Sequence, residues 1–544
     1  MTDATRDTSH EPKWWQDITA DEFRWHMPST FNIGLAVLEN KADDDVAIIE
    51  TGTRELVVTF GRLADEARRL ATWMRDNGVR EGDRIAVFLA QQYELAAIHV
   101  AGYLIGAIVV TLTTRFGPDA VQFRLADSES KLIFGEAADL QRIAPPLESV
   151  ESLTHVVTVG EGEAGSQQAT RVSYQEGLDA APMSLDDVKP TDPEAPAVLI
   201  YTSGTTGNPK GALHGHQILI GHMPGIRYTH ANFPQPRDMM WTPAEWAWIG
   251  GLFDILLPSL ACNIPVVASK SRFSPELAKH IFEDIGARNA FLPPTALKQL
   301  RASNTQVRPG AIRTLAAGGE PLGAELQAWC EKHLGVGVNE FYGQTEMNLV
   351  VGQDRTRENP PTGSMGRQLP GFDVTILDDQ GEPVEPDQIG EICVATPNPG
   401  EFLGYWNQPE QTRSKYHGNY LRTGDLGSQD EDGYFYFASR SDDVILSGGY
   451  RIGPAEVEEA LLKHPSVAMA AVVGQPDDMR GEVVAAYVVL VDGVEGTDEL
   501  KAEIQDMVKH SLAFYEYPKR LEFRDELPMT PTGKIQRRLL RDPS

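Results

Sequence analysis

The chain has 544 residues, enough for several domains of roughly 100–200 residues each, which excludes a small peptide-like module. Hydrophobic residues make up 41% and charged residues 23% of the chain, so neither a disordered chain nor a fibrous repeat fits. The formal net charge of −30 would repel a phosphodiester backbone or an anionic membrane surface, so nucleic acid is not an expected partner.

Residues 1–13 carry acidic side chains and lack an apolar core, so they resemble neither a secretory signal nor a transit peptide. The cysteines at 262, 330 and 393 lie far apart and lack the spacing of metal ligands, which disfavours a disulfide framework or a structural zinc. These features predict a cytoplasmic protein.

Short apolar runs alternate with helical patterns from about residue 85 to residue 317, which is typical of an α/β fold with layers around mostly parallel sheets. The runs that we expect to form strands are Ile85–Leu89, Ala107–Leu112, Ala197–Tyr201, Ile264–Ala268, Ala290–Leu292 and Thr314–Ala317.

One stretch within this region, residues 95–114, has no acidic or basic residue and about the length of a membrane span. However, Gly102 and Gly106 interrupt it, and residues 107–112 are rich in β-branched side chains. We therefore interpret it as a buried helix that leads into a buried parallel strand, and we expect no integral membrane span.

The pattern changes twice towards the end of the chain. Turn-rich alternating segments at 383–392 and 433–438 predict a small β-rich subdomain over about residues 365–438. From residue 444 onward, expected helices at 454–463 and 497–511 alternate with expected strands at 468–473 and 483–490. We expect a large N-terminal domain over residues 1–438, a hinge at 439–443 and a small, mobile α+β domain over 444–544.

The sharpest local signal is the segment Tyr201-Thr-Ser-Gly-Thr-Thr-Gly-Asn-Pro-Lys-Gly211, which directly follows an apolar strand. Glycines and small hydroxyl residues leave backbone N–H groups free to surround phosphate oxygens, and Lys210 adds a positive charge. The spacing is not that of a Walker A motif. We predict a phosphate-binding loop rather than a plain glycine-rich turn, formed by Thr202, Ser203, Gly204, Thr205, Thr206, Gly207 and Lys210.

This loop closely resembles the signature loop of the adenylate-forming superfamily, which includes acyl-CoA synthetases, firefly luciferase and peptide-synthetase adenylation domains. Five further motifs of that superfamily follow in its order. They are Gly318-Gly-Glu-Pro321, Tyr342-Gly-Gln-Thr-Glu346, Tyr420-Leu-Arg-Thr-Gly-Asp-Leu426, Arg440-Ser-Asp-Asp-Val-Ile-Leu-Ser-Gly-Gly-Tyr-Arg451 and Pro528-Met-Thr-Pro-Thr-Gly-Lys534.

The resemblance implies a role for each motif in binding ATP, with Mg²⁺ as cofactor. It places an adenine pocket at Gly319, Glu320 and Pro321, and nucleotide contacts at Tyr342, Gln344, Thr345, Arg440 and Arg451. Thr345 would donate to the α-phosphate, Glu346 would hold magnesium, and Asp425 would accept from the ribose hydroxyls. Lys534, Thr345 and Glu346 would be the catalytic residues.

Elementary chemistry agrees with these roles, because joining a carboxylate to the α-phosphate of ATP brings two anions together and the site must supply cations. Each of these acidic and basic residues also has an interpretation without a role in the reaction. Glu346 would otherwise be a solvated loop acid, and Asp425 a turn or cap residue. Lys534 would otherwise belong to a solvated basic end, together with Arg537, Arg538 and Arg541.

Within the superfamily, residues 440–489 look most like the medium-chain acyl-CoA synthetases. The chain ends too soon for a downstream carrier domain, so coenzyme A is the expected acceptor, with contacts at Gly448, Gly449, Tyr450 and Lys509. The expected activity is an AMP-forming acyl-CoA synthetase acting on a small carboxylic acid. The alternatives are an acyl- or aryl-AMP ligase with another acceptor, an aryl-CoA ligase, and a non-catalytic nucleotide sensor.

The expected chain length of the acid depends on side-chain volume. Acetate-selective relatives carry large side chains at the positions of Gly318 and Gly343, so their absence here predicts a deeper acyl pocket. We expect Trp248 to form a wall of this pocket, although Trp241 and Trp246 compete for the role. The expected substrates are straight or branched acids of about four to ten carbons.

Lys534 and the thiol of coenzyme A, which would pass Gly449, cannot reach one small site together. The C-terminal domain is therefore expected to adopt two orientations. Asp442 matches the family's hinge position, with a solvated loop acid as the alternative.

Overall fold

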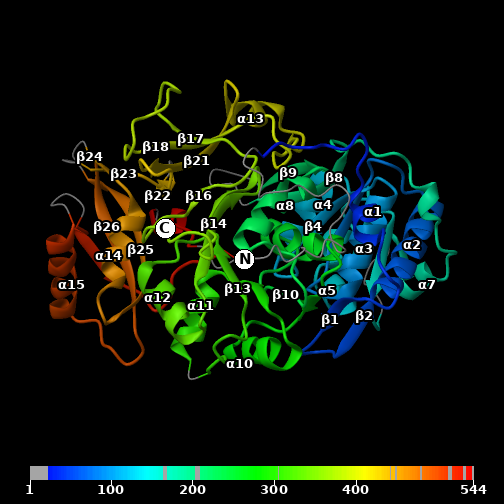
Figure 1. Ribbon diagram of the computed structural model, residues 1–544, viewed down its shortest axis with the longest axis horizontal. Helices are drawn as coiled ribbons and strands as arrows, with labels where there is room; N and C mark the ends of the chain where they lie inside the picture. The colour runs from blue at the N-terminus through cyan, green and yellow to red at the C-terminus, as the bar shows by residue number, and fades with distance from the viewer. Residues whose placement is uncertain are drawn as a thin grey trace, which may run out of the picture. The chain divides into compact units, whose positions relative to one another are not determined.

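The computed structural model describes residues 23–162, 168–202, 209–303, 305–440, 443–447, 450–477, 481–512, 517–530 and 535–541 (Figure 1). The chain divides into two compact units. The first runs to Pro360 and includes Arg367–Phe372 and Thr396–Tyr416. The second consists of Pro361–Gly366, Asp373–Ala395 and the chain from His417 onward, so the β-rich region and the C-terminal region share one unit.

An eight-stranded sheet in the first unit has the order β19-β9-β8-β4-β3-β5-β6-β7. Its strands are β3 (Arg84–Phe88), β4 (Ile108–Leu112), β5 (Leu132–Glu136), β6 (His155–Val159), β7 (Thr170–Ser173), β8 (Pro196–Thr202), β9 (Lys210–Gly215) and β19 (Gly404–Tyr405). The strands from β8 to β7 pair in parallel, whereas β9 is antiparallel to both β8 and β19. The predicted α/β architecture is confirmed here.

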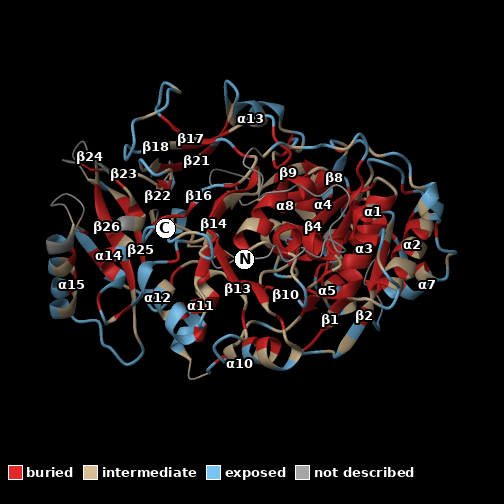
Figure 2. Ribbon diagram, viewed as in Figure 1, coloured by how far each residue is buried: buried red, intermediate tan, exposed pale blue. Residues whose placement is uncertain are grey.

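The apolar stretch that could have suggested a membrane span folds as expected. Its first part is α3 (Tyr93–Leu104), in which every residue is buried, and its second part is the fully buried strand β4. Figure 2 shows both elements in the colour of buried residues. A helix that is apolar all round belongs in the core of a large protein. Among the described residues, no helix is long and apolar enough to cross a bilayer.

A nine-stranded sheet, also in the first unit, has the order β16-β15-β14-β13-β12-β10-β11-β1-β2. Its strands are β1 (Val46–Glu50), β2 (Leu56–Thr59), β10 (Met240–Trp241), β11 (Val266–Ala268), β12 (Asn289–Phe291), β13 (Thr314–Gly318), β14 (Val338–Gln344), β15 (Asn348–Gly352) and β16 (Arg367–Gln368). The strands from β1 to β14 through the centre are parallel, and the pairs at the two ends are antiparallel.

Helices accompany these two sheets. The α-helices of the first unit are α1 (Ile33–Leu38), α2 (Phe60–Asp76), α4 (Pro118–Ser128), α5 (Ala137–Arg142), α6 (Ala144–Leu147), α7 (Tyr174–Leu178), α8 (Ile218–Thr229), α9 (Leu257–Ala261), α10 (Pro275–His280), α11 (Pro294–Ala302), α12 (Ala324–His333), α13 (Pro409–Ser414) and the buried α3. Side chains of β3, β4 and β8 pack with α4 in one apolar cluster, which fixes the strand that leads to the predicted phosphate loop.

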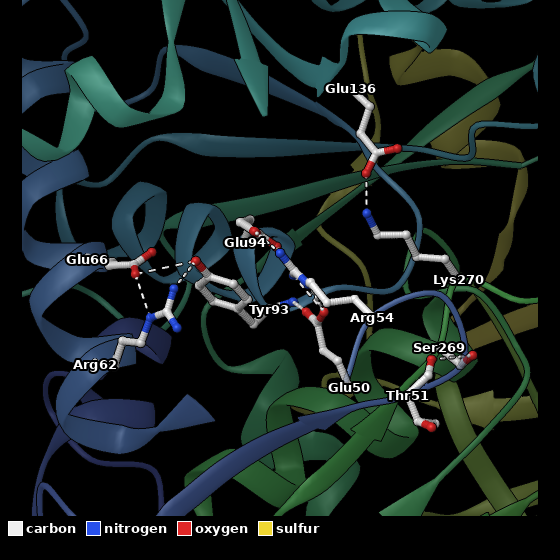
Figure 3. Close-up of polar contacts among 10 residues, drawn as sticks. All are labelled: Glu50, Thr51, Arg54, Arg62, Glu66, Tyr93, Glu94, Glu136, Ser269 and Lys270. Carbon is white, nitrogen blue, oxygen red and sulfur yellow. Dashed lines mark hydrogen bonds and ion pairs between the residues drawn. The ribbon is translucent and has the colours of Figure 1, made fainter. Parts of the chain in front are cut away.

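A polar network ties α2 and α3 to the carboxyl end of β1 (Figure 3). The guanidinium of Arg54 donates to both carboxylate oxygens of Glu94, at 3.0 and 2.9 Å, and to Glu50 at 2.6 Å. Glu50 also accepts the backbone N–H of Tyr93 at 2.6 Å, where α3 begins. The guanidinium of Arg62 lies 4.5 Å from the ring centroid of Tyr93. These buried carboxylates are therefore all matched by donors.

The second unit contains two further sheets. The first has antiparallel strands β17 (Val374–Leu377), β18 (Gly390–Ala395), β21 (Tyr420–Gln429) and β22 (Phe435–Arg440). The other has the order β24-β23-β26-β25 with β27 on β26, formed by β23 (Ile445–Ser447), β24 (Tyr450–Ile452), β25 (Val467–Asp477), β26 (Gly481–Leu490) and β27 (Arg520–Phe523). Its helices are α14 (Pro454–Leu462), α15 (Asp498–Ser511) and α16 (Arg538–Arg541).

The α+β character predicted for the C-terminal region is thus confirmed, with each expected helix and strand present. Apolar residues of α14, β25, β26 and α15 form a single buried cluster. The boundaries proposed for a separate C-terminal domain, and the hinge at 439–443, stay predictions.

Candidate functional site

The predicted phosphate loop joins two neighbouring strands of the eight-stranded sheet. Thr202 ends β8 and Lys210 begins β9, and the two residues are directly opposite each other in the antiparallel ladder. The hydroxyl of Thr202 donates to the carbonyl of Lys210 at 3.4 Å. Both ends of the loop are therefore held at one point of the sheet. The other predicted loop residues, Ser203, Gly204, Thr205, Thr206 and Gly207, lie outside the described residues.

Thr345 and Glu346 occupy the turn between β14 and β15. Gln344 ends β14, and Asn348 begins β15 with a positive φ of 63°, a backbone conformation that Asn tolerates better than most residues. The carbonyl of Glu346 accepts the N–H of Phe402 at 2.9 Å. The turn is thus attached to the segment that leads into β19.

Tyr405 brings Lys210 and Glu346 together. The hydroxyl of Tyr405 donates to the carboxylate of Glu346 at 2.6 Å, and the Nζ of Lys210 lies 5.2 Å from the centre of the same ring. Such an arrangement attracts a cation to the ring face without neutralising its charge. Within the described part of the chain, Lys210 forms no ion pair with a carboxylate. The arrangement leaves this ammonium available to an anionic ligand.

Sequence reasoning missed Tyr405. The residue reaches the site because β19 pairs with β9, with Tyr405 opposite Ala212. The local signal was an aromatic pair, Tyr405 and Trp406, in an otherwise turn-rich run. That signal does not reveal which strand the pair would join.

The donor set at Glu346 fits a magnesium ion that arrives with its ligand. The described residues contain no group of three or more His, Cys, Asp or Glu side chains that could hold a metal by themselves. Magnesium is usually held by one or two carboxylates together with substrate phosphates and waters. A single carboxylate oriented by Tyr405 meets that requirement.

The predicted adenine segment follows β13. Gly319 has a φ of +86°, a backbone conformation that favours glycine. The carboxylate of Glu320 accepts the hydroxyl of Thr295, with both oxygens at 3.0 Å, and Pro321 is exposed. Tyr342, from the neighbouring motif, is buried on β14. Gly319 and Pro321 are therefore exposed, and Glu320 anchors the segment to Thr295.

Glu340 is a second residue that the sequence did not single out. Its carboxylate accepts the N–H of Leu322 at 3.4 Å and so contacts the end of the adenine segment. Burial of the carboxyl group raises the pKa of Glu340 to about 8. The local signal was an acid between Asn339 and Phe341.

In the second unit, Asp425 and Arg440 face each other across the β21–β22 ladder. Asp425 is buried, and its Oδ1 lies 3.7 Å from the Nε of Arg440. The backbone N–H of Asp425 donates to the hydroxyl of Thr423 at 2.9 Å. The structure therefore brings together Asp425, which the resemblance assigned to the ribose, and Arg440, which it assigned to the nucleotide.

Of the three candidate tryptophans, Trp248 keeps part of its surface exposed, whereas Trp241 and Trp246 are each 1% exposed. The ring of Trp248 contacts Phe116 edge-on, with the centroids 5.8 Å apart. Trp248 is thus the member of this set that can border a ligand. Trp241 belongs to the apolar cluster of the nine-stranded sheet.

A side chain at Gly318 or at Gly343 would meet close neighbours. Gly318 is paired with Phe341 across the ladder, and a Cβ atom on Gly318 would lie 2.5 Å from the Phe341 ring. A Cβ atom on Gly343 would lie 1.9 Å from the carbonyl oxygen of Asn348. A side chain at either position would therefore require these neighbours to move. That these glycines line the acyl pocket stays a prediction.

Several predicted residues lie outside the described part of the chain: Lys534, Asp442, Gly448 and Gly449. Tyr450 and Arg451 belong to β24. Lys509 lies on α15 with its Nζ 5.6 Å from the ring centre of Tyr517. It lines a surface hollow together with Ala502, Gln505, Asp506, Tyr517 and Lys519.

Comparison with known proteins places this geometry in a family. Residues 36–406 match the profile of AMP-binding enzymes, and residues 456–534 match the AMP-binding enzyme C-terminal domain. The chain is 34% identical to the acetyl-coenzyme A synthetase of Bacillus subtilis, over 90% of this chain and 85% of that protein. It is 32% identical to the mitochondrial acyl-coenzyme A synthetase ACSM4 of Rattus norvegicus, over 99% and 96%.

Solved structures agree. The Brucella canis acyl-CoA synthetase is 33% identical with a TM-score of 0.72, covering 94% of both chains. The anthranilate CoA ligase AuaEII, in complex with anthranoyl-AMP, is 25% identical with a TM-score of 0.84, over 95% of this chain and 97% of that one. The chain therefore belongs to the AMP-binding enzyme family, and within the adenylate-forming superfamily it belongs to the acyl-CoA synthetases.

Proposed function

We propose that the protein joins a carboxylic acid to coenzyme A with ATP, through an acyl-adenylate. In the first step the carboxylate oxygen bonds to the α-phosphorus and pyrophosphate leaves. In the second step the thiol sulfur bonds to the acyl carbon, AMP leaves, and the thiol proton is released. The observation that carries this proposal is the convergence of Lys210 and Glu346 on Tyr405.

Lys210 faces the phosphates in this proposal, because its charge is not neutralised by a protein carboxylate and its strand begins where the phosphate loop ends. Glu346 would hold magnesium, which when bound would offset negative charge on the phosphate oxygens. Thr345, in the same turn, would donate to the α-phosphate. Lys210 and a magnesium ion held by Glu346 would thus supply positive charge, and Thr345 a donor, where negative charge develops.

Asp425 and Arg440 are proposed to hold the ribose, with Asp425 accepting from the sugar hydroxyls. Their pairing across neighbouring strands supports this role, because the ladder fixes the distance between them. The purine is proposed to lie against Gly319, Glu320 and Pro321. Glu340, as a buried acceptor at the end of that segment, could accept from an exocyclic amine.

Lys534 is proposed to act in the first half-reaction, acyl-AMP formation. Asp442 is proposed as the hinge that lets the C-terminal domain change orientation between the two half-reactions. Replacing Lys534 with Ala should slow acyl-AMP formation by about 10²–10³-fold, the scale of losing one charge stabiliser. Thioester formation from supplied acyl-AMP should be slowed much less.

Asp442→Pro should preserve one half-reaction and greatly reduce the other, because proline fixes φ and would hold the C-terminal domain in one orientation. Equal losses in both half-reactions would contradict each assignment.

The proposed substrates are short to medium straight or branched acids. The resemblance of residues 440–489 to medium-chain acyl-CoA synthetases supports this class, and the partly exposed ring of Trp248 offers an apolar wall. An aromatic acid is the second candidate. The similarity to the anthranilate CoA ligase favours it, as does the pair formed by Phe291 and Phe341, whose ring centres are 5.1 Å apart.

The test is a panel of acids from acetate to dodecanoate, with branched and aromatic members, assayed for AMP formation with and without coenzyme A. The same panel with Phe341→Ala should move the optimum towards larger acids, since each buried methylene contributes about 0.8 kcal/mol. If AMP forms equally well without coenzyme A, the proposal is wrong and the protein is a ligase that uses another acceptor. An unchanged preference in Phe341→Ala would remove Phe341 from the acyl pocket.

We also propose a cytoplasmic location. Some relatives are named as mitochondrial proteins. Fractionation of the native cell would measure the location of this protein.

A further inference from the structure

Four charged side chains near the end of the chain form a cluster, the tail cluster: Arg537, Arg541, Asp443 and Glu458. Arg537 donates to the two carboxylate oxygens of Glu458 at 2.9 and 2.8 Å, and to Asp443 at 3.3 Å. Arg541 donates to the other oxygen of Asp443 at 2.8 Å. The side chains of Glu458 and Asp443 are only 13% and 14% exposed.

The tail cluster joins parts of the second unit that are far apart in sequence. Glu458 lies on α14 and also accepts the N–H of Val472, on β25, at 2.8 Å. Asp443 directly follows the predicted hinge residue, and its N–H donates to the carbonyl of Arg440 at 3.1 Å. The C-terminal segment is thereby attached both to the C-terminal sheet and to the chain beside the proposed ribose site.

Backbone contacts also hold the C-terminal segment, residues 535–541. Ile535 forms an isolated antiparallel bridge with Met529, and the N–H of Gln536 donates to the carbonyl of Pro528 at 2.8 Å. The carbonyl of Leu540 accepts the hydroxyl of Tyr487 at 3.0 Å. Residues 535–541 therefore have a defined position on β25, β26 and α14. Lys534 directly precedes Ile535 in the sequence.

A buried ion cluster is weak evidence for stability, since well-packed apolar residues would often stabilise the fold as well or better. What the planar fork of an arginine supplies is a fixed direction of approach to a carboxylate. The neighbouring Arg538 is exposed, so the segment uses one arginine of this pair for attachment and turns the other to solvent.

We propose that Arg537, through Glu458 and Asp443, is a positioning residue for Lys534. It holds the C-terminal segment and the chain beyond the hinge as one piece, so that Lys534 reaches the phosphates whenever the C-terminal region adopts its adenylation orientation. The inference rests on the proposed function, because it assigns Lys534 to the adenylation step.

The test compares Arg537→Gln and Glu458→Gln with Arg538→Gln as the matched control. Adenylation is measured by ATP–pyrophosphate exchange with the best acid of the panel, and thioester formation is measured from supplied acyl-AMP. Displacing a catalytic group by about 1 Å costs on the order of 10²-fold. We expect the Arg537 and Glu458 variants to lose about that factor in the kcat of exchange, with KM for ATP and the thioester step nearly unchanged. Arg538→Gln should behave as the wild type.

Hydrogen exchange gives a readout that does not depend on activity. Amides of residues 535–541 should exchange faster in Arg537→Gln than in Arg538→Gln, while amides of β25 and β26 stay protected. If Arg537→Gln fails to fold, two milder variants replace it: Asp443→Asn weakens the contacts of Asp443 with Arg537 and Arg541, and Arg541→Gln removes only the contact of Arg541 with Asp443. Both should show the same split, reduced to about 10-fold.

Two results would overturn the inference: equal losses in both half-reactions by a folded variant, or exchange rates in residues 535–541 that match those of Arg538→Gln. A wild-type protein that exchanges pyrophosphate with no acid would instead refute the proposed function. The hydrogen-exchange comparison would still decide whether the tail cluster holds the segment.

Discussion

Two regions of the first unit combine a cation, a tyrosine and a glutamate in different ways. In the network of Figure 3, Arg54 contacts Glu94 and Glu50 directly, at 2.6–3.0 Å. At the candidate site, Tyr405 separates Lys210 from Glu346 by offering its ring to one and its hydroxyl to the other. The first arrangement pairs a cation directly with two carboxylates and joins helices to a strand. The second keeps a cation and a carboxylate near each other without pairing them, so that each can bind a ligand.

The comparison shows how a charged group can be assigned to structure or to ligand binding. A buried carboxylate without its cation is costly, so the Figure 3 network should contribute to folding. A lysine on a ring face gains only about 0.5–2 kcal/mol, which leaves it free to interact more strongly with a phosphate. Exchange of one cation in each region tests this difference.

The largest effect is expected for Lys210→Met. Loss of a cation that faces the phosphates should reduce the kcat/KM of adenylation by about 10²–10³-fold, with little change in Tm. The matched control is Lys270→Met, because Lys270 is ion-paired with Glu136. The control should retain adenylation within about threefold. A comparable loss in both variants would remove the distinction between the two lysines.

Tyr405→Phe sharpens the comparison, because it retains the ring beneath Lys210 and removes the hydroxyl from Glu346. Misorienting a metal-binding carboxylate costs roughly 10–100-fold, so we expect KM for Mg·ATP to rise by about 10-fold. Tyr416→Phe is the control, since its hydroxyl donates to Glu401 at the same distance of 2.6 Å. Titration of magnesium at fixed ATP gives the measurement. An unchanged magnesium dependence would contradict the role of Glu346.

Arg54→Met tests the structural region. It leaves Glu50 and Glu94 without their cation, and an unsatisfied buried acceptor costs about 1–3 kcal/mol. Urea denaturation should show that loss, while kcat per folded molecule stays the same. Arg413→Met is the control, because the pair of Arg413 with Glu410 is exposed and should contribute under about 0.5 kcal/mol. A large fall in kcat without a loss of stability would overturn the structural assignment.

The smallest effect is expected for Glu340→Gln, and it concerns pH. Burial raises the pKa of Glu340 to about 8, so the folded state retains a proton that the unfolded chain releases near pH 4.5. This contribution to stability is present at low pH and is lost as the pH rises towards 8. Glu340→Gln should flatten the decline in the urea midpoint between about pH 5 and 9. Glu151→Gln, at an exposed site, should leave the decline as in the wild type.

Local patterns predicted the parts of the fold that depend on local physics. The absence of charge and the β-branched residues identified α3 and β4, since both elements are buried on all sides. The glycine and hydroxyl pattern predicted a loop after β8, and the structure holds its two ends, Thr202 and Lys210, opposite each other. These inferences needed no knowledge of which distant segments meet.

The remaining features depend on long-range register. Tyr405 enters the site only because β19 adds to β9, and the ring of Phe341 fills the space at Gly318 only because β13 pairs with β14 in that register. The arginines 537, 538 and 541 look alike in sequence, yet two of them bind Asp443 and one is exposed. Residue type alone did not distinguish these cases.

The pairing of Gly318 with Phe341 constrains the order in which these two positions can be changed by mutation. A larger residue at position 318 would meet the Phe341 ring at 2.5 Å and the Phe341 carbonyl oxygen at 2.8 Å. If residue 341 is shortened first, the ring contact is removed. A larger residue at position 318 then needs only a small shift of β14, away from the carbonyl oxygen of residue 341. Introducing bulk at position 318 first passes through a clash that overpacking makes costly. A library that varies both positions together would reach variants that sequential single changes in the wrong order would lose.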